Sequence, residues 1–208
     1  MSGWKTSNQY SRLRNREVEY PHDSGDNVHD RGIIKPEFNF IESLIDHNLR
    51  RFHKNSKNDV IIIYELSQEV FYRHNERNPE LADLAASLFL FFSDFANYLS
   101  VEEKQLIPSV QGLIQKTKHS EIRNSDNKTD MRKLIRKIRL EHHAAIKKLI
   151  YFRTLTKDYK VPENTSKSYR HFFSRLKKFE HDVAMYFHFE NKKFFPLAIE
   201  LEDYLNNM

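Results

Sequence analysis

The sequence predicts an all-α fold, an up-down-up-down four-helix bundle that follows a short irregular N-terminal arm. Apolar residues recur every three or four positions over four long stretches, as they do on the buried face of a helix. Only one glycine, Gly112, lies beyond residue 36, and strand-like alternation is almost absent. Four long helices with short connections bury their apolar faces most simply as an antiparallel bundle.

The arm is expected at residues 1–36 and the bundle at residues 37–208. Three of the four glycines and the polar run "PHDSGDNVHDRG" lie in the first 36 residues, which show no sustained periodicity. Such a segment cannot bury enough apolar surface to order itself. We therefore expect it to be flexible or loosely docked, and its role is left open.

Prolines and polar runs set the expected helix ends. We expect a first helix over residues 36–55, or over 36–74 with a break near "NSKND", and a second from the N-cap Asn78 and Pro79 to about residue 116. A third helix is expected over 131–155 and a fourth over 162–204. Pro108 and Pro196 are expected to kink or end their helices, because proline removes an amide donor and clashes with the preceding turn.

Composition excludes several classes of protein. The chain has no cysteine, so disulfides and thiolate metal sites are excluded, and any metal would take nitrogen and oxygen ligands. No run of 18 apolar residues and no apolar leader is present, so we expect a cytoplasmic protein that makes no contact with a membrane. The charge of +5 raises the question of nucleic acid, but the most basic segment, 131–148, has the pattern of an amphipathic helix with a solvated basic face. Nucleic-acid binding is therefore not expected.

The second and fourth helices carry matching apolar stripes. Their members follow the spacing 4, 3, 4, 3, 4 and are offset by 88 residues: Leu84, Leu88, Phe91, Phe95, Tyr98, Glu102 and Phe172, Leu176, Phe179, Val183, Tyr186, Glu190. The proline that follows each stripe obeys the same offset. The match indicates a duplicated pair of helices.

Each stripe ends in an acid, Glu102 or Glu190, that should point into the bundle. Buried carboxylates without partners are unfavourable, so a compensating group is expected. The other two helices supply His53 and His142, each in phase with its apolar stripe. Two carboxylates that bridge two metal ions, each ion also bound by imidazole, are a known arrangement in helix bundles.

These residues resemble the repair-of-iron-centres (RIC) proteins, a hemerythrin-like di-iron branch with two H…HxxxE half-sites. The resemblance covers roughly residues 38–200 and is carried by "LIDHNLRRFH" (44–53), "RHNERNPEL" (73–81), "EEKQLIP" (102–108), "EHHAAIKKL" (141–149) and "ENKKFFP" (190–196). It implies two non-haem iron ions, or iron mixed with manganese, with His53, Glu102, His142 and Glu190 among the ligands. His74 matches another family histidine and is given a supporting role near the site. His47 is a further candidate to orient a ligand.

The sequence departs from the family at Tyr98 and Tyr186, where the family has histidine four residues before each glutamate. Three interpretations stay open. The tyrosines could bind iron as phenolates, because ferric iron favours oxygen donors, or they could hydrogen-bond the bridging carboxylates. Alternatively, no metal binds and the histidines and glutamates form a buried network. We favour direct participation of the tyrosines, since both half-sites carry the same change.

The resemblance implies a role in iron–sulfur cluster repair or in the response to nitric oxide and oxidants, with damaged iron–sulfur proteins or a small gas as partners. An alternative is a hemerythrin-like sensor or store that binds O2 or NO without turnover. A metal-free helical interaction protein is a further alternative. The sequence leaves open the oligomeric state and whether the protein is an enzyme.

Overall fold

The computed structural model describes residues 36–118 and 130–207, and every regular element in these ranges is helical. The elements are α1 (Pro36–Leu44), η2 (Ile45–Leu49), α2 (Arg50–His74), α3 (Glu80–Val101), η3 (Glu102–Leu106), α4 (Ile107–Lys118), α5 (Met131–Leu155), α6 (Lys167–Phe189), η4 (Glu190–Phe194) and α7 (Phe195–Asn206). The three η elements are single π-helical turns inside longer helices. The predicted arm lies outside the described residues except for Pro36, so the boundary between arm and bundle stays a prediction.

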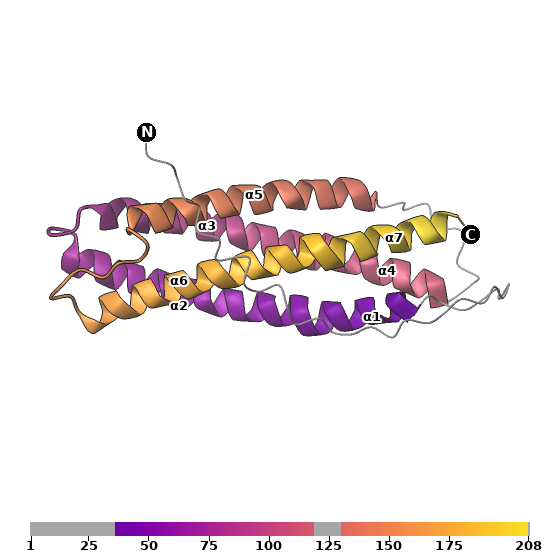
Figure 1. Cartoon of the computed structure of the whole chain (residues 1–208), viewed down its shortest axis with the longest axis horizontal. Helices are drawn as coiled ribbons and strands as arrows, with labels where there is room; N and C mark the ends of the chain where they lie inside the picture. The colour runs from indigo at the N-terminus through magenta and orange to yellow at the C-terminus, as the bar shows by residue number, and fades with distance from the viewer. Residues whose placement is uncertain (1–35, 119–129, 208) are drawn as a thin grey trace, which may run out of the picture. The chain divides into compact units, whose positions relative to one another are not determined.

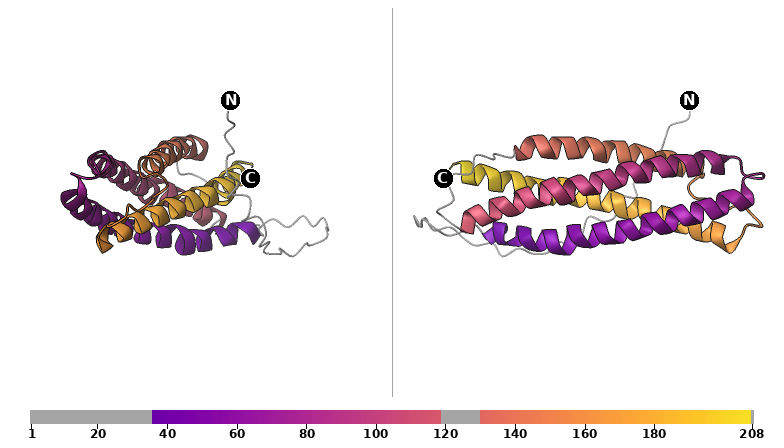
Figure 2. Two further views of the ribbon diagram at one scale, coloured as in Figure 1. Left: turned by 60° about the vertical axis from the view of Figure 1, so that its left-hand side comes forward. Right: turned by 180° about the vertical axis from the view of Figure 1, so that it is seen from behind.

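Four antiparallel rods form the bundle, which confirms the predicted fold class (Figure 1). The first rod is α1–η2–α2, the second α3–η3–α4, the third α5 and the fourth α6–η4–α7. α2 packs against α3 and α6, and α5 packs against the same two helices from the other side. The first two rods lie side by side in the right-hand view of Figure 2.

The predicted break near "NSKND" is wrong, because α2 runs through residues 55–59 as a regular α-helix. Tertiary contacts override the low helix propensity of these polar residues. Ser56 is buried, and Asp59 accepts an ion pair from Arg175 of α6 at 3.0 Å. The first rod departs from α-helical geometry earlier, at η2.

Neither Pro108 nor Pro196 ends a helix. Each is the second residue of an α-helix, α4 or α7, that continues directly from a π-turn. In the π-turn the amide of the residue before proline donates five residues back, from Ile107 to Glu102 and from Phe195 to Glu190. The wider π-turn shifts the backbone hydrogen bonds by one residue just before the proline, at the position where proline lacks an amide donor and would break the α-helical pattern.

The predicted start of α5 is confirmed, whereas the predicted cap of α3 is wrong. α5 has the predicted bounds, and Asp130 caps it by accepting a hydrogen bond from the Lys133 amide. Asn78 does not cap α3, since its side chain donates to the His74 carbonyl and Pro79 stands at the N-cap.

α6 begins five residues later than predicted, at Lys167, where the Ser166 hydroxyl caps it. Lys157, Asp158 and Tyr159 all have positive φ angles, so the chain turns sharply after α5 before it enters this loop. Pro162 lies in the loop and not in the helix.

The long helix Glu80–Lys118 has the length and composition of a membrane span, which the search for apolar runs did not anticipate. Such a helix is weak evidence for a membrane, because core helices have the same composition. Several of its apolar residues, including Leu84, Leu88 and Phe95, are buried in the bundle core, whereas Phe89 and Leu90 are exposed.

Candidate metal centre

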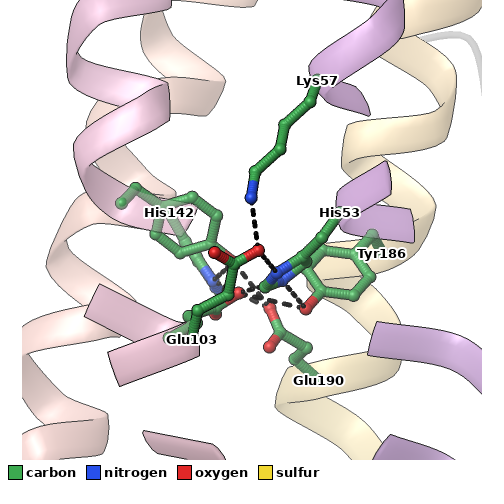
Figure 3. Close-up of polar contacts among 8 residues, drawn as sticks. His53, Lys57, Glu103, His142, Tyr186 and Glu190 are labelled. Atoms are coloured by element: carbon green, nitrogen blue, oxygen red, sulfur yellow. Dashed lines mark hydrogen bonds and ion pairs between the residues drawn. The ribbon is translucent and has the colours of Figure 1, made fainter. Parts of the chain in front are cut away.

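The six predicted site residues converge in the middle of the bundle from all four rods (Figure 3). Their side chains are buried, and both glutamates have no exposed surface. The set comprises His53 of α2, Tyr98 of α3, Glu102 of η3, His142 of α5, Tyr186 of α6 and Glu190 of η4. The convergence on which the sequence argument depended is therefore present.

In the first half of the centre, His53 faces Glu102. The Nε2 atom of His53 lies 2.9 Å from Oε2 of Glu102 and 3.1 Å from the hydroxyl of Tyr186. The same Tyr186 hydroxyl lies 3.1 Å from Oε2 of Glu102. An imidazole nitrogen, a carboxylate oxygen and a phenol oxygen therefore surround one small volume.

In the second half, His142 faces Glu190 in the same way. Its Nε2 atom lies 3.1 Å from Oε2 of Glu190 and 3.2 Å from the hydroxyl of Tyr98. Phe187 stacks on the His142 ring at 3.8 Å between centroids, and Phe195 stacks on it at 5.7 Å. Burial, followed by the nearby charges of Arg139 and His143, lowers the pKa of His142 to about 3, so this imidazole is neutral at physiological pH.

Tyr98 joins the two acids. Its hydroxyl lies 2.6 Å from Oε1 of Glu102 and 3.0 Å from Oε2 of Glu190. Oε1 of Glu190 is buried without a hydrogen-bond partner. Burial and the neighbouring Glu102 hold the pKa of Glu190 well above its usual value, because a second negative charge in this apolar volume is unfavourable.

Both tyrosines are neutral donors in the metal-free protein. Burial and the charges of Glu102 and Glu190 raise the pKa of Tyr98 and of Tyr186 well above 10. A phenolate would therefore form here only if a cation replaced the proton. In the metal-free structure the two tyrosines hydrogen-bond the carboxylates, as one of the three interpretations describes. Binding of the tyrosines to a metal ion stays a prediction.

Each acid occupies the first position of a π-turn, directly after a regular helix. The i, i+4 spacing within the preceding turn brings Tyr98 against Glu102 on one face. π-Turns are frequent at functional sites because the inserted residue redirects the side chains around it.

Sequence reasoning missed two residues of the site, Glu103 and Asn191, which lie one position beyond the two stripe acids. Oε1 of Glu103 lies 3.0 Å from Nδ1 of His53 and accepts from Lys57 at 2.6 Å. Asn191 contacts Nδ1 of His142 at 3.1 Å. Their offset of 88 residues was a usable signal, because it places them at equivalent positions of the repeat.

The pKa of Glu103 is lowered. Its partial burial acts in the opposite direction, but hydrogen bonds from Lys57 and His53 stabilise the carboxylate more strongly. A pocket of about 460 Å³ borders this part of the centre, lined by residues that include His53, Lys57 and Glu103.

The structure places His74 away from the centre. It lies at the C-terminal end of α2, about 30 Å along the helix from His53. There its Nε2 atom contacts the hydroxyl of Ser166 at 3.1 Å, and its ring meets Tyr169 edge to face. The expected supporting role near the site was wrong, because this histidine instead contacts Ser166, the residue that caps α6. His47 belongs to η2, and its side chain lies outside the described part of the structure.

The donor set fits a hard or borderline cation. Ligand atoms of Glu102, His142 and Glu190 lie within 4.8 Å of one another, and all three residues are buried. The partnerless oxygen of Glu190 and the opposed carboxylates are the features that a positive charge would compensate. Carboxylate, imidazole and phenol donors without sulfur suit iron or manganese.

Comparison with known proteins gives two results. The sequence model described as "Hemerythrin HHE cation binding domain" matches residues 44–198. The iron–sulfur cluster repair protein YtfE of Dickeya chrysanthemi is 24% identical over 159 residues, which cover 76% of this chain and 66% of that protein. A probable iron–sulfur cluster repair protein of Haemophilus influenzae is 23% identical over 156 residues, which cover 75% of this chain and 64% of that protein. The chain thus spans just under two thirds of the length of these relatives.

Proposed function

The chain belongs to the hemerythrin HHE cation binding domain family, and from this premise we propose that it is a cytoplasmic non-haem iron protein of iron–sulfur cluster repair. The proposed centre holds two iron ions, or iron mixed with manganese. The proposed setting is the response to nitric oxide and oxidants.

One observation carries the metal-binding part of the proposal: Glu102 and Glu190 face each other in the core with no exposed surface. Two neighbouring buried acids, one of them with an unpaired oxygen, would contribute little to stability as a purely structural pair. The same arrangement becomes favourable when cations lie between the carboxylates.

His53, His142, Glu102 and Glu190 would hold the metal, with the phenol oxygens of Tyr98 and Tyr186 facing the same volume. Bound iron would supply a Lewis-acidic and redox-active centre. The chain itself positions the two imidazoles: Glu103 contacts the outer nitrogen of His53, and Asn191 contacts that of His142. Phe187 and Phe195 exclude water from the His142 side.

Elemental analysis of protein reconstituted with iron under anaerobic conditions tests the centre. We expect about two irons per chain, as in carboxylate-bridged bundle sites, and loss of both in a Glu102→Ala, Glu190→Ala double variant. A Glu180→Gln variant is the matched control, because Glu180 is also a buried acid of α6 but lies outside the centre. Absence of iron from the reconstituted wild type would refute the proposal.

Tyrosine ligation has a separate spectroscopic test. If the phenolates bind ferric iron, the oxidised protein should show a visible charge-transfer band that the Tyr98→Phe, Tyr186→Phe double variant lacks. A band that persists unchanged in this variant would assign the tyrosines to hydrogen bonding alone. Iron stoichiometry, measured on the same samples, separates loss of the band from loss of the metal.

The repair role is supported by the similarity to the two iron–sulfur cluster repair proteins. The proposed partners are damaged iron–sulfur proteins. The test is recovery of activity by an iron–sulfur enzyme inactivated with nitric oxide, after addition of the iron-loaded protein. We expect recovery with the wild type and none with the Glu102→Ala, Glu190→Ala variant. Equal recovery from free iron alone would argue against the role.

Binding of O2 or NO without turnover is the second candidate. A pocket of about 380 Å³ lies against Tyr186, and its mixed lining includes the apolar residues Phe52, Phe179, Met185 and Phe189 beside charged residues such as Arg51 and Asp182. Such a lining could admit a small gas to the edge of the centre. Titration of reduced, iron-loaded protein with O2 discriminates the two candidates, since a reversible spectral change without product would favour the carrier.

A further inference from the structure

We propose that the two halves of the centre bind metal with unequal affinity, and that the His53–Glu102 half fills first. The inference rests on the proposed metal-binding function and specifies how this chain regulates it. It follows from one difference between equivalent positions of the repeat: Glu103 stands beside His53, whereas Asn191 stands beside His142.

The orientation of the Asn191 side chain is fixed by its neighbours. Nε of Arg139 can only donate, and it donates to Oδ1 of Asn191 at 3.1 Å. The Phe187 carbonyl can only accept, and it accepts from Nδ2 of Asn191 at 2.8 Å. Nδ2 therefore faces Nδ1 of His142, and it must donate there too.

This contact sets the tautomer of His142. Nδ1 accepts from Asn191, so the ring proton lies on Nε2, the nitrogen that faces Glu190 and Tyr98. A proton thus occupies the position that a metal ion would need. The half-site is assembled for hydrogen bonding.

His53 has the opposite arrangement. The Glu103 carboxylate accepts from Nδ1–H and is itself held by Lys57. Nε2 faces Glu102 and Tyr186, and the Tyr186 hydroxyl donates to Glu102, so a proton on Nε2 would also be accommodated in the metal-free protein. A metal ion at Nε2 would displace that proton and leave the Nδ1–H bond to Glu103 unchanged. A carboxylate behind a metal-binding imidazole is the usual way to hold the correct tautomer and increase its basicity.

Metal binding in the second half therefore requires a rearrangement that the first half does not. The His142 proton would have to move to Nδ1, and the Asn191 amide would have to turn over, with loss of its bonds to Arg139 and Phe187. Ring reversal is opposed as well, because Phe187 and Phe195 stack on the imidazole. Loss of such an outer partner typically lowers metal affinity about 10–100-fold.

The tautomers can be observed without metal. Long-range ¹H–¹⁵N spectra of the metal-free protein should show a proton on Nδ1 of His53 and no proton on Nδ1 of His142. The assignment uses His53→Gln and His142→Gln variants. A proton on Nδ1 of His142, or none on Nδ1 of His53, would overturn the inference.

The affinities are measured by anaerobic titration with Fe(II), with Co(II) as a spectroscopic probe. We expect one tight equivalent followed by a second that binds at least about tenfold more weakly. In Asn191→Glu both halves carry an acid behind the imidazole, and the two affinities should converge through a stronger second site. Glu103→Asn is the matched control, and it should weaken the first site.

Two equal sites in the wild type, or an Asn191→Glu variant with unchanged affinities, would overturn the inference and leave the proposed metal-binding function intact. Absence of binding by either metal ion would remove both.

Discussion

Two buried acids in the fourth rod, Glu180 and Glu190, have opposite surroundings. Glu180 accepts two hydrogen bonds from Arg153, one of them at 3.2 Å, and one from Tyr159 at 2.7 Å. Glu190 instead faces a second acid and keeps one oxygen without a partner. Burial alone therefore does not identify a functional acid.

The surroundings explain the different roles. Glu180 and its partners Arg153 and Tyr159 form a cluster that connects the loop after α5 to α6. In this loop Lys157, Asp158 and Tyr159 adopt positive φ angles. The charges and donors of the cluster are matched within the protein, so nothing further is needed. The Glu190 cluster has an excess of acceptors, which a proton on Glu190 or a bound cation would balance.

The largest expected stability change tests the structural acid. Glu180→Ala should destabilise the protein by about 3 kcal/mol, because it leaves the Tyr159 hydroxyl unpaired and removes the ion pair between Glu180 and Arg153. Iron stoichiometry should not change. Urea unfolding and elemental analysis of the folded variant measure the two effects. Loss of iron without loss of stability would reverse the assignment of roles.

Glu190→Gln should act in the opposite direction on the metal-free protein. The amide removes the opposition between two acids, so we expect a gain of about 1 kcal/mol in unfolding free energy. The stabilisation that added Fe(II) gives the wild type should be lost in this variant. Thermal unfolding with and without Fe(II) measures both changes, and a less stable metal-free variant would contradict the comparison.

Tyr159→Phe should destabilise the protein by about 1 kcal/mol at neutral pH through loss of one buried hydrogen bond. Burial, then the bond to Glu180, raises the pKa of Tyr159 in the folded state. A raised pKa means that the stabilisation is complete below about pH 10, the unfolded value, and is lost as pH rises towards the folded value. The stability deficit of the variant should therefore shrink above pH 10. Urea unfolding of both proteins at pH 7 and pH 11 measures this difference in unfolding free energy. The same difference at both pH values would contradict the prediction.

The smallest effect concerns His74, which lies in neither cluster. His74→Ala removes the contact with the capping Ser166, so a loss of about 0.5 kcal/mol is expected. Iron content should stay at the wild-type value. A loss of iron comparable to that of a centre variant would restore the supporting role that the sequence motif implied.

Periodicity predicted the rods and the convergence of the six site residues, because a stripe of constant spacing fixes which side chains face the core. The π-turns were not predictable in this way, since they depend on a hydrogen-bond register and not on residue type. The fourth helix was expected to start at residue 162, but it starts after the cap Ser166. The sequence did not indicate this later start, because the sharp turn at residues 157–159 depends on the tertiary hydrogen bonds of Tyr159.

The residues that contact the outer nitrogens of the two histidines could not be predicted, for a different reason. Glu103 and Asn191 are polar residues one step beyond the apolar stripes, and ordinary solvation explained them equally well. Their contacts became visible only once His53 and His142 had fixed side-chain directions. The repeat could have flagged them as a pair but not shown what they bind.

The π-turns η3 and η4 extend the 88-residue repeat from the sequence to the backbone. They occupy equivalent positions, 102–106 and 190–194, each with an acid first and a proline two residues beyond the end. Because both turns present their acid to the same volume, the approximate symmetry of the centre is built into the main chain of the second and fourth rods. The turn η2 has no π-helical counterpart in α5, so the first and third rods depart from this symmetry.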